Sequence, residues 1–81
     1  MGVTGTIPPH LGNLSFLTLL NIGNNRFHGH LPNELALLRR LKVVNLGVNN
    51  FSGEVPLWFG ILPKLQLLLL FNNSFSENYW T

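Results

Sequence analysis

A repeat of 24 residues runs through most of this chain of 81 residues. Its clearest copy is the segment 38–56, LRRLKVVNLGVNNFSGEVP, in which apolar residues, an asparagine, a phenylalanine, a glycine and a proline follow at fixed intervals. The same order appears 24 positions earlier, and most of it recurs 24 positions later. A fixed period of this length is typical of a solenoid, in which each repeat packs against its neighbours. The repeat therefore constrains the fold before any other property of the chain.

The copies of the repeat indicate one domain, 1–81, of about three coils. Residues 1–13 match the back half of a repeat, 14–37 and 38–61 are two full repeats, and 62–81 are a degenerate third. In the third copy Glu77 replaces the glycine, and Tyr79-Trp80 replace the apolar residue and the proline. The start does not resemble a signal peptide, and no apolar run approaches the roughly 20 residues of a membrane helix. We therefore expect a repeat fragment without capping segments, a targeting signal or a membrane anchor.

Period-two alternation within each repeat predicts a short strand with one buried face. The buried pairs are Leu20/Ile22, Val44/Leu46 and Leu68/Leu70. We expect strands near 19–22, 43–46 and 67–70, aligned as a parallel sheet along one side of the coil. Residues 27–31 and 51–55 also alternate, which makes a second short strand per coil plausible. Pro32 and Pro56 then open a return segment, where apolar residues every third position favour short 3₁₀ turns.

An asparagine follows each predicted strand, at Asn25, Asn49 and Asn73. The chain must bend there, and bending leaves backbone N–H and C=O groups without ladder partners. An asparagine amide both donates and accepts, so an inward side chain can bond backbone in its own and neighbouring coils. We expect the three to form a structural ladder. Two residues later, one large ring per coil should fill the interior behind it, at Phe27, Phe51 and Phe75.

This pattern resembles the plant-type leucine-rich repeat, LxxLxxLxLxxNxLxGxIPxxLGxL, over residues 3–75. The resemblance implies an α/β fold, a right-handed solenoid with a parallel sheet on its concave side and short 3₁₀ or irregular returns. Ectodomains of plant leucine-rich-repeat receptor-like Ser/Thr kinases are similar, and the chain looks like an internal slice of one. That resemblance implies a non-catalytic module at the extracellular face of the plasma membrane, which recognises a protein or peptide ligand or a co-receptor.

Outward-facing strand positions are the candidate binding residues, because solenoids commonly bind partners on the concave face. They are Leu19, Asn21, Val43, Asn45, Val48, Leu67, Leu69 and Phe71. Leu67, Leu69 and Phe71 should form an exposed apolar patch, which can mark an interaction surface. The alternative is that an incomplete solenoid exposes residues that missing neighbours would modulate.

Three Asn-x-Ser sequons, at Asn13, Asn50 and Asn72, are glycan acceptors if the chain is secreted. Asn50, at a predicted corner, is the best candidate. Asn72 lies next to the ladder.

The residue types present give little support for catalysis, metal binding or cofactor binding. The chain contains no Asp and no Cys, and no glycine-rich phosphate loop. His28 and His30 share a face near Glu54, but solvated surface is the simpler interpretation. Net charge is only +2, with 10% charged residues, so we expect no nucleic-acid partner. We predict no enzyme activity, no cofactor, no metal and no direct membrane contact.

Two other functions remain open at this level. Secreted plant inhibitors of cell-wall-degrading enzymes resemble the same repeat and have no kinase. A nonfunctional truncated fragment is the other alternative, because about three repeats without polar caps lie near the minimum for stability. Marginal stability or aggregation of the isolated chain is expected on that ground.

Overall fold

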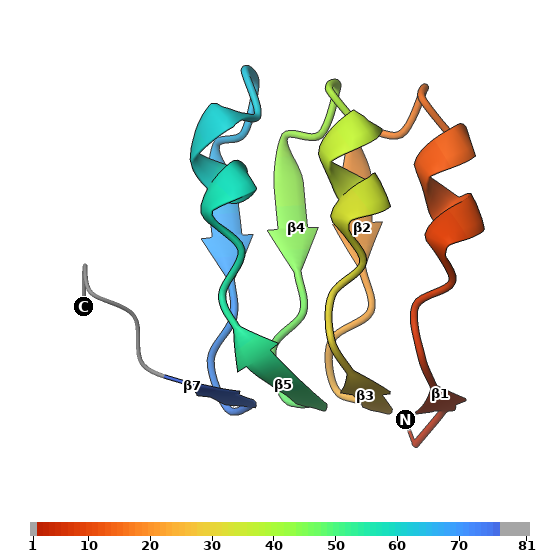
Figure 1. Cartoon of the computed structure of the whole chain (residues 1–81), viewed down its shortest axis with the longest axis vertical. Coiled ribbons are helices and arrows are strands. Elements are labelled where there is room, and N and C mark those ends of the chain that lie inside the picture. The colour runs from red at the N-terminus through yellow and green to blue at the C-terminus, as the bar shows by residue number, and fades with distance from the viewer. Residues whose placement is uncertain (1, 77–81) are drawn as a thin grey trace.

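The computed structural model, which describes residues 2–76, is a stack of coils with a parallel strand ladder on each of two sides (Figure 1). The 3₁₀ helices of successive coils stack beside one another on a further side (Figure 1). The predicted Glu77 and Tyr79-Trp80 departures lie outside the described residues.

The first sheet contains three parallel strands in the order β2-β4-β6. The strands are β2 (Leu19–Asn21), β4 (Val43–Asn45) and β6 (Leu67–Leu69). Each pairs with its neighbour at an offset of 24 residues, as Leu20 does with Val44. Each strand ends one residue before the predicted boundary, although Ile22 N still donates to Asn45 O at 3.0 Å. The repeat period therefore sets the register of this sheet.

The second sheet is also parallel, in the order β1-β3-β5-β7. Its strands are β1 (Thr4–Gly5), β3 (Arg26–Gly29), β5 (Asn50–Glu54) and β7 (Ser74–Ser76). Pairing partners here are 22 residues apart, as in His28 with Asn50. The register of this sheet therefore shifts by two residues per coil relative to the 24-residue repeat. Because two residues is one strand period, the same side chains stay on the same face. The predicted second strand per coil exists, beginning one residue earlier than the alternation indicated.

Three five-residue 3₁₀ helices form the return side: η1 (Pro9–Asn13), η2 (Asn33–Leu37) and η3 (Leu57–Ile61). Spacing in threes suits their i→i+3 bonds, as in Leu38 N to Leu35 O at 3.0 Å. Pro32 and Pro56 have extended ψ values of 141° and 134° and cap η2 and η3. The return therefore begins one residue after each of these prolines.

The core is concentrated in the middle of the stack. The fully buried large side chains are Leu35, Leu38, Leu41, Val44, Leu46 and Phe51. Leu38 is 0% exposed, whereas Leu14, at the same repeat position one coil earlier, is 37% exposed. A solenoid residue is fully buried only when a coil covers it on both sides. The middle coil is therefore the most deeply buried part of the described chain.

Candidate ligand-binding surface

The corner after each strand of the first sheet is closed by an asparagine side chain. Asn49 Nδ2 donates to Ile22 O at 3.0 Å, to Leu46 O at 3.2 Å and to Gly47 O at 3.3 Å. Its Oδ1 accepts from Phe27 N at 3.0 Å. Asn49 thus connects backbone groups of two coils, and both ends of its amide are occupied.

The equivalent asparagines repeat this arrangement. Asn73 Nδ2 donates to Leu46 O at 2.8 Å, and its Oδ1 accepts from Phe51 N at 3.0 Å. Asn25 Oδ1 accepts from Val3 N at 3.2 Å. Among the described residues, no buried side-chain nitrogen or oxygen lacks a hydrogen-bond partner. These amides belong to the scaffold and leave no group for a ligand.

The three phenylalanines form a stack inside the same corner. The rings of Phe27 and Phe51 are 6.3 Å apart at their centroids and nearly parallel, at 5°. Phe51 and Phe75 are also 6.3 Å apart, at 14°. One ring per coil therefore fills the interior continuously, with Phe51 completely buried between the other two.

The outward face of β2, β4 and β6 carries the candidate binding residues. Leu19, Leu67 and Phe71 are 55%, 46% and 54% exposed, so large apolar groups do face solvent there. Leu69 is half-buried, and the apolar patch is consequently narrower than predicted, formed mainly by Leu67 and Phe71. The three strands contain no charged residue.

Two asparagines on this face are held by their own backbone. Asn21 Oδ1 accepts from Gly23 N at 3.2 Å, and Asn45 Oδ1 accepts from Gly47 N at 2.9 Å. An Asn side chain that bonds the backbone two residues on forms an Asx turn. These bonds fix which end of each amide carries the oxygen.

Glycines beside these asparagines are covered by side chains from the next coil. A Cβ added to Gly23 would lie 3.0 Å from Asn45 Nδ2, and one added to Gly47 would lie 2.8 Å from Phe71 Cε1. The Asn45 amide therefore lies over Gly23, and the Phe71 ring lies over Gly47. Sequence reasoning missed this overlap, although the Asn-x-Gly spacing in both coils was a usable signal for the turn.

Val43 and Val48 are the remaining concave candidates. Val43 is half-buried in β4, and Val48 has a strained backbone. Its φ is 58°, close to the 59° of Asn24 and the 54° of Asn72 at equivalent positions. Left-handed backbone is tolerated by asparagine but is a genuine outlier for a β-branched residue. Val48 is half-buried at the end of the binding face. The strained backbone of this valine lowers the stability of the scaffold.

The three sequon asparagines are all exposed. Asn13 ends η1, Asn50 begins β5, and Asn72 occupies the corner beside the ladder. Asn50 Oδ1 accepts from Ser74 Oγ at 3.0 Å, across neighbouring coils. Glycosylation at the three positions stays a prediction.

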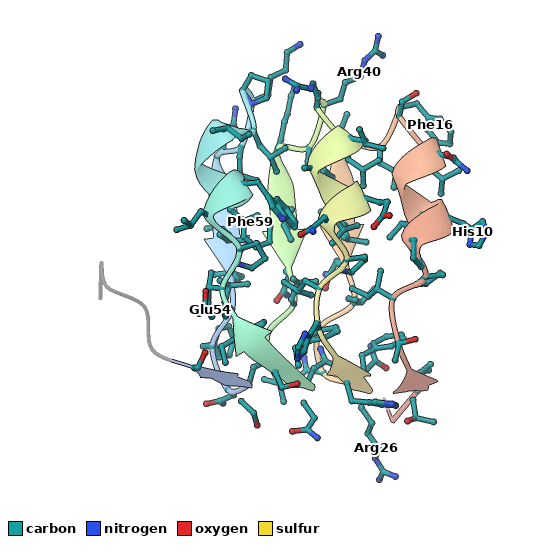
Figure 2. The ribbon with its side chains drawn as sticks, viewed as in Figure 1. His10, Phe16, Arg26, Arg40, Glu54 and Phe59 are labelled. Atoms are coloured by element: carbon teal, nitrogen blue, oxygen red, sulfur yellow. The ribbon has the colours of Figure 1, made fainter. Side chains whose placement is uncertain are left out.

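The described histidines and glutamates are spread over the molecule and do not form a metal-binding group. His30 packs over Gly53, where an added Cβ would lie 3.0 Å from the ring Cδ2. Within residues 2–76, no three His, Cys, Asp or Glu side chains are placed to hold a metal ion. His10 and Glu54 lie at opposite sides of the molecule (Figure 2).

Arg26 and Arg40 point away from each other at opposite ends of the long axis (Figure 2). In the described part of the chain, no helix has the length and apolar character needed to cross a membrane.

Stacked coils, two parallel sheets and short 3₁₀ returns define a solenoid repeat protein. Residues 16–38 and 40–62, more than half of the chain, match the family described as Leucine Rich Repeat. The chain belongs to the leucine-rich-repeat family. No match was found among curated proteins.

Solved plant receptor ectodomains share this fold. The structure of a TDR receptor is 43% identical with a TM-score of 0.88, and the alignment covers 91% of this chain and 13% of that one. The leucine-rich-repeat ectodomain of the receptor kinase SOBIR1 from Arabidopsis thaliana is 38% identical with a TM-score of 0.86, covering 90% and 40%. The Arabidopsis receptor kinase HAESA, solved with the peptide hormone IDA and the co-receptor SERK1, is 40% identical with a TM-score of 0.88, covering 93% and 13%.

The chain therefore spans between about an eighth and two fifths of the length of these three structures. It resembles a receptor-kinase ectodomain in repeat type and coil geometry, over the part that the alignments cover. The leucine-rich-repeat ectodomain fold is typically non-catalytic.

Proposed function

We propose that this chain is a non-catalytic recognition module that binds a protein or peptide partner on the outward face of β2, β4 and β6. The observation that carries the proposal is the exposed, uncharged character of this face. Leu19, Leu67 and Phe71 remain about half exposed there, whereas scaffold polar groups nearby are hydrogen-bonded. A surface of this kind gains free energy when a partner removes it from water.

The likeness to receptor ectodomains supports the same proposal. HAESA was solved with a peptide hormone and a co-receptor, and another structural neighbour, the receptor RGFR1, was solved with RGF2. In an equivalent role this chain would lie at the extracellular face of the plasma membrane, where Asn13, Asn50 and Asn72 would be open to glycosylation. The partner would lie across several coils at once, so that specificity comes from complementarity along the stack.

The proposal is tested by binding of the purified 81-residue chain to an array of synthetic twelve-residue peptides. We expect a subset of peptides to be retained by the wild-type chain and to be lost with Leu67→Glu. A buried, unpaired carboxylate opposes docking of an apolar partner, and Leu67 is 46% exposed before binding.

Ile61→Glu is the matched control. Ile61 is 65% exposed at the end of η3, away from the strand face. This variant should retain the same peptides as the wild-type chain. Failure of the wild-type chain to retain any peptide, or equal losses in both variants, would contradict the proposal.

A further inference from the structure

The outward face of β2 and β4 carries two hydrogen-bond donors that the fold orients and leaves unused. Asn21 and Asn45 each place Oδ1 on a backbone N–H two residues on. Each Nδ2 group then lies at the opposite end of an amide whose rotation is fixed. In the described part of the chain, neither Nδ2 has a hydrogen-bonding partner.

The two donors lie on adjacent coils, because Asn21 and Asn45 are register partners in the parallel sheet. Adjacent strands are about 4.8 Å apart, and an extended chain advances about 3.3 Å per residue. An extended segment that crosses the two strands therefore advances by one to two residues between the donors. The third coil has Leu69 at this position, so the row of donors stops after the second coil.

An aromatic ring adjoins the oxygen end of the Asn45 amide, whereas Nδ2 of that amide lies against Gly23. The Phe71 ring leans back over Gly47, and Asn45 Oδ1 is 3.2 Å from the Cβ position of that same glycine. A side chain at this position would displace the ring. The ring is 54% exposed. A ring against which an apolar side chain can pack thus lies one coil beyond the second donor, on the Oδ1 side of Asn45.

We infer that Asn21 and Asn45 are specificity-determining donors for backbone carbonyls of an extended, uncharged peptide segment whose next apolar side chain packs on Phe71. This inference rests on the proposed function and names the chemistry of its ligand. Backbone carbonyls fit because the donors are neutral amides, and the strands carry no charge that would favour an ionic partner. Oriented donors bind without the entropic cost of ordering an amide.

Substitution by aspartate separates the ligand role of these residues from their structural role. Asn45→Asp keeps an acceptor for Gly47 N, but replaces the Nδ2 donor with an oxygen that repels a carbonyl. Peptides retained by the wild-type chain on the array are measured by titration calorimetry against Asn21→Asp, Asn45→Asp and the control Asn13→Asp. Asn13 lies in η1 and makes the same chemical change outside the strand face.

We expect affinity to fall about tenfold or more in Asn21→Asp and Asn45→Asp, since a hydrogen bond is lost and an unpaired charge is buried. Asn13→Asp should bind like the wild-type chain. The retained peptides should be enriched in uncharged sequences with one large apolar residue, and their addition should shift the Nδ2 proton resonances of Asn21 and Asn45.

Each other outcome has a distinct meaning. If Leu67→Glu abolishes binding but both aspartate variants bind normally, the donor assignment is wrong and the proposed function stands. If no peptide is retained by the wild-type chain, the proposed function fails and the inference fails with it. If the Nδ2 resonances stay unchanged at saturation, or if acidic peptides dominate the retained set, the donor assignment is overturned. Binding lost only because Asn45→Asp is unfolded, with unshifted wild-type resonances, also overturns it.

Discussion

This solenoid contains two columns of asparagine, and their side-chain amides differ in the hydrogen bonds that they make. At the corner, Asn49 donates three hydrogen bonds and accepts one, all with backbone of two coils. On the strand face, Asn45 Oδ1 accepts one hydrogen bond from Gly47 N, and its Nδ2 group is left for a partner. The same side chain is therefore scaffold in one column and surface chemistry in the other. The difference arises because an inward amide meets bending backbone, while the outward amide of Asn45 lies over Gly23 of the neighbouring coil.

The largest effect should come from removing a ladder donor. Asn49→Asp keeps an acceptor for Phe27 N but places a carboxylate oxygen against the carbonyls of Ile22, Leu46 and Gly47. We expect the free energy of unfolding to fall by about 3 kcal/mol, because several partly buried acceptors lose their donor. Urea unfolding measures the change. A loss below about 1 kcal/mol would show that the ladder is not what holds the corner.

Asparagine has a third use one residue before the ladder, where the backbone is left-handed. Val48→Asn replaces a strained β-branched residue, whose φ is 58°, with the residue type found at the two equivalent positions. We expect a gain of about 1 kcal/mol in the free energy of unfolding from relief of this strain. The reverse change, Asn72→Val, where φ is 54°, should lose a similar amount. Thermal unfolding of the pair tests this, and a destabilised Val48→Asn would refute it.

The smallest effect on stability is expected for the substitution that matters most for the ligand. Asn45→Asp retains the bond from Gly47 N, and the Nδ2 group that it replaces makes no hydrogen bond within the described residues, so unfolding free energy should change by no more than about 0.5 kcal/mol. Urea unfolding beside Asn49→Asp makes the contrast direct. Similar destabilisation by the two substitutions would remove the distinction between the columns.

The period alone predicts most of the scaffold, because each repeat position has one backbone environment. The strands, the corner asparagines and the stacked phenylalanines follow from it, as do the short 3₁₀ returns. Exposure of Leu14 and full burial of Leu38 do not, since equal repeat positions differ in how many coils cover them. The period does not determine the surface, where side chains lean between coils.

The candidate site illustrates the same limit. The positions facing outward were predictable from alternation. The overlap of Phe71 with Gly47 was not, because it depends on the absence of a side chain at Gly47 in the preceding coil. The left-handed backbone of Val48 could have been suspected from Asn24 and Asn72 at the equivalent positions. The unused Nδ2 group of Asn45 could not have been predicted, because it depends on the orientation that the hydrogen bond from Gly47 N imposes on the amide.

Hydrogen exchange of the two side-chain amides tests the central claim most directly. In the wild-type chain without ligand, the Nδ2 protons of Asn49 should exchange at least about tenfold more slowly than those of Asn45, since only the ladder amide is held by backbone carbonyls. Measurement by NMR reports both rates in one sample. Equal rates would contradict the account, because Asn45 would then be as fully engaged as the ladder and could not serve as a donor to a peptide.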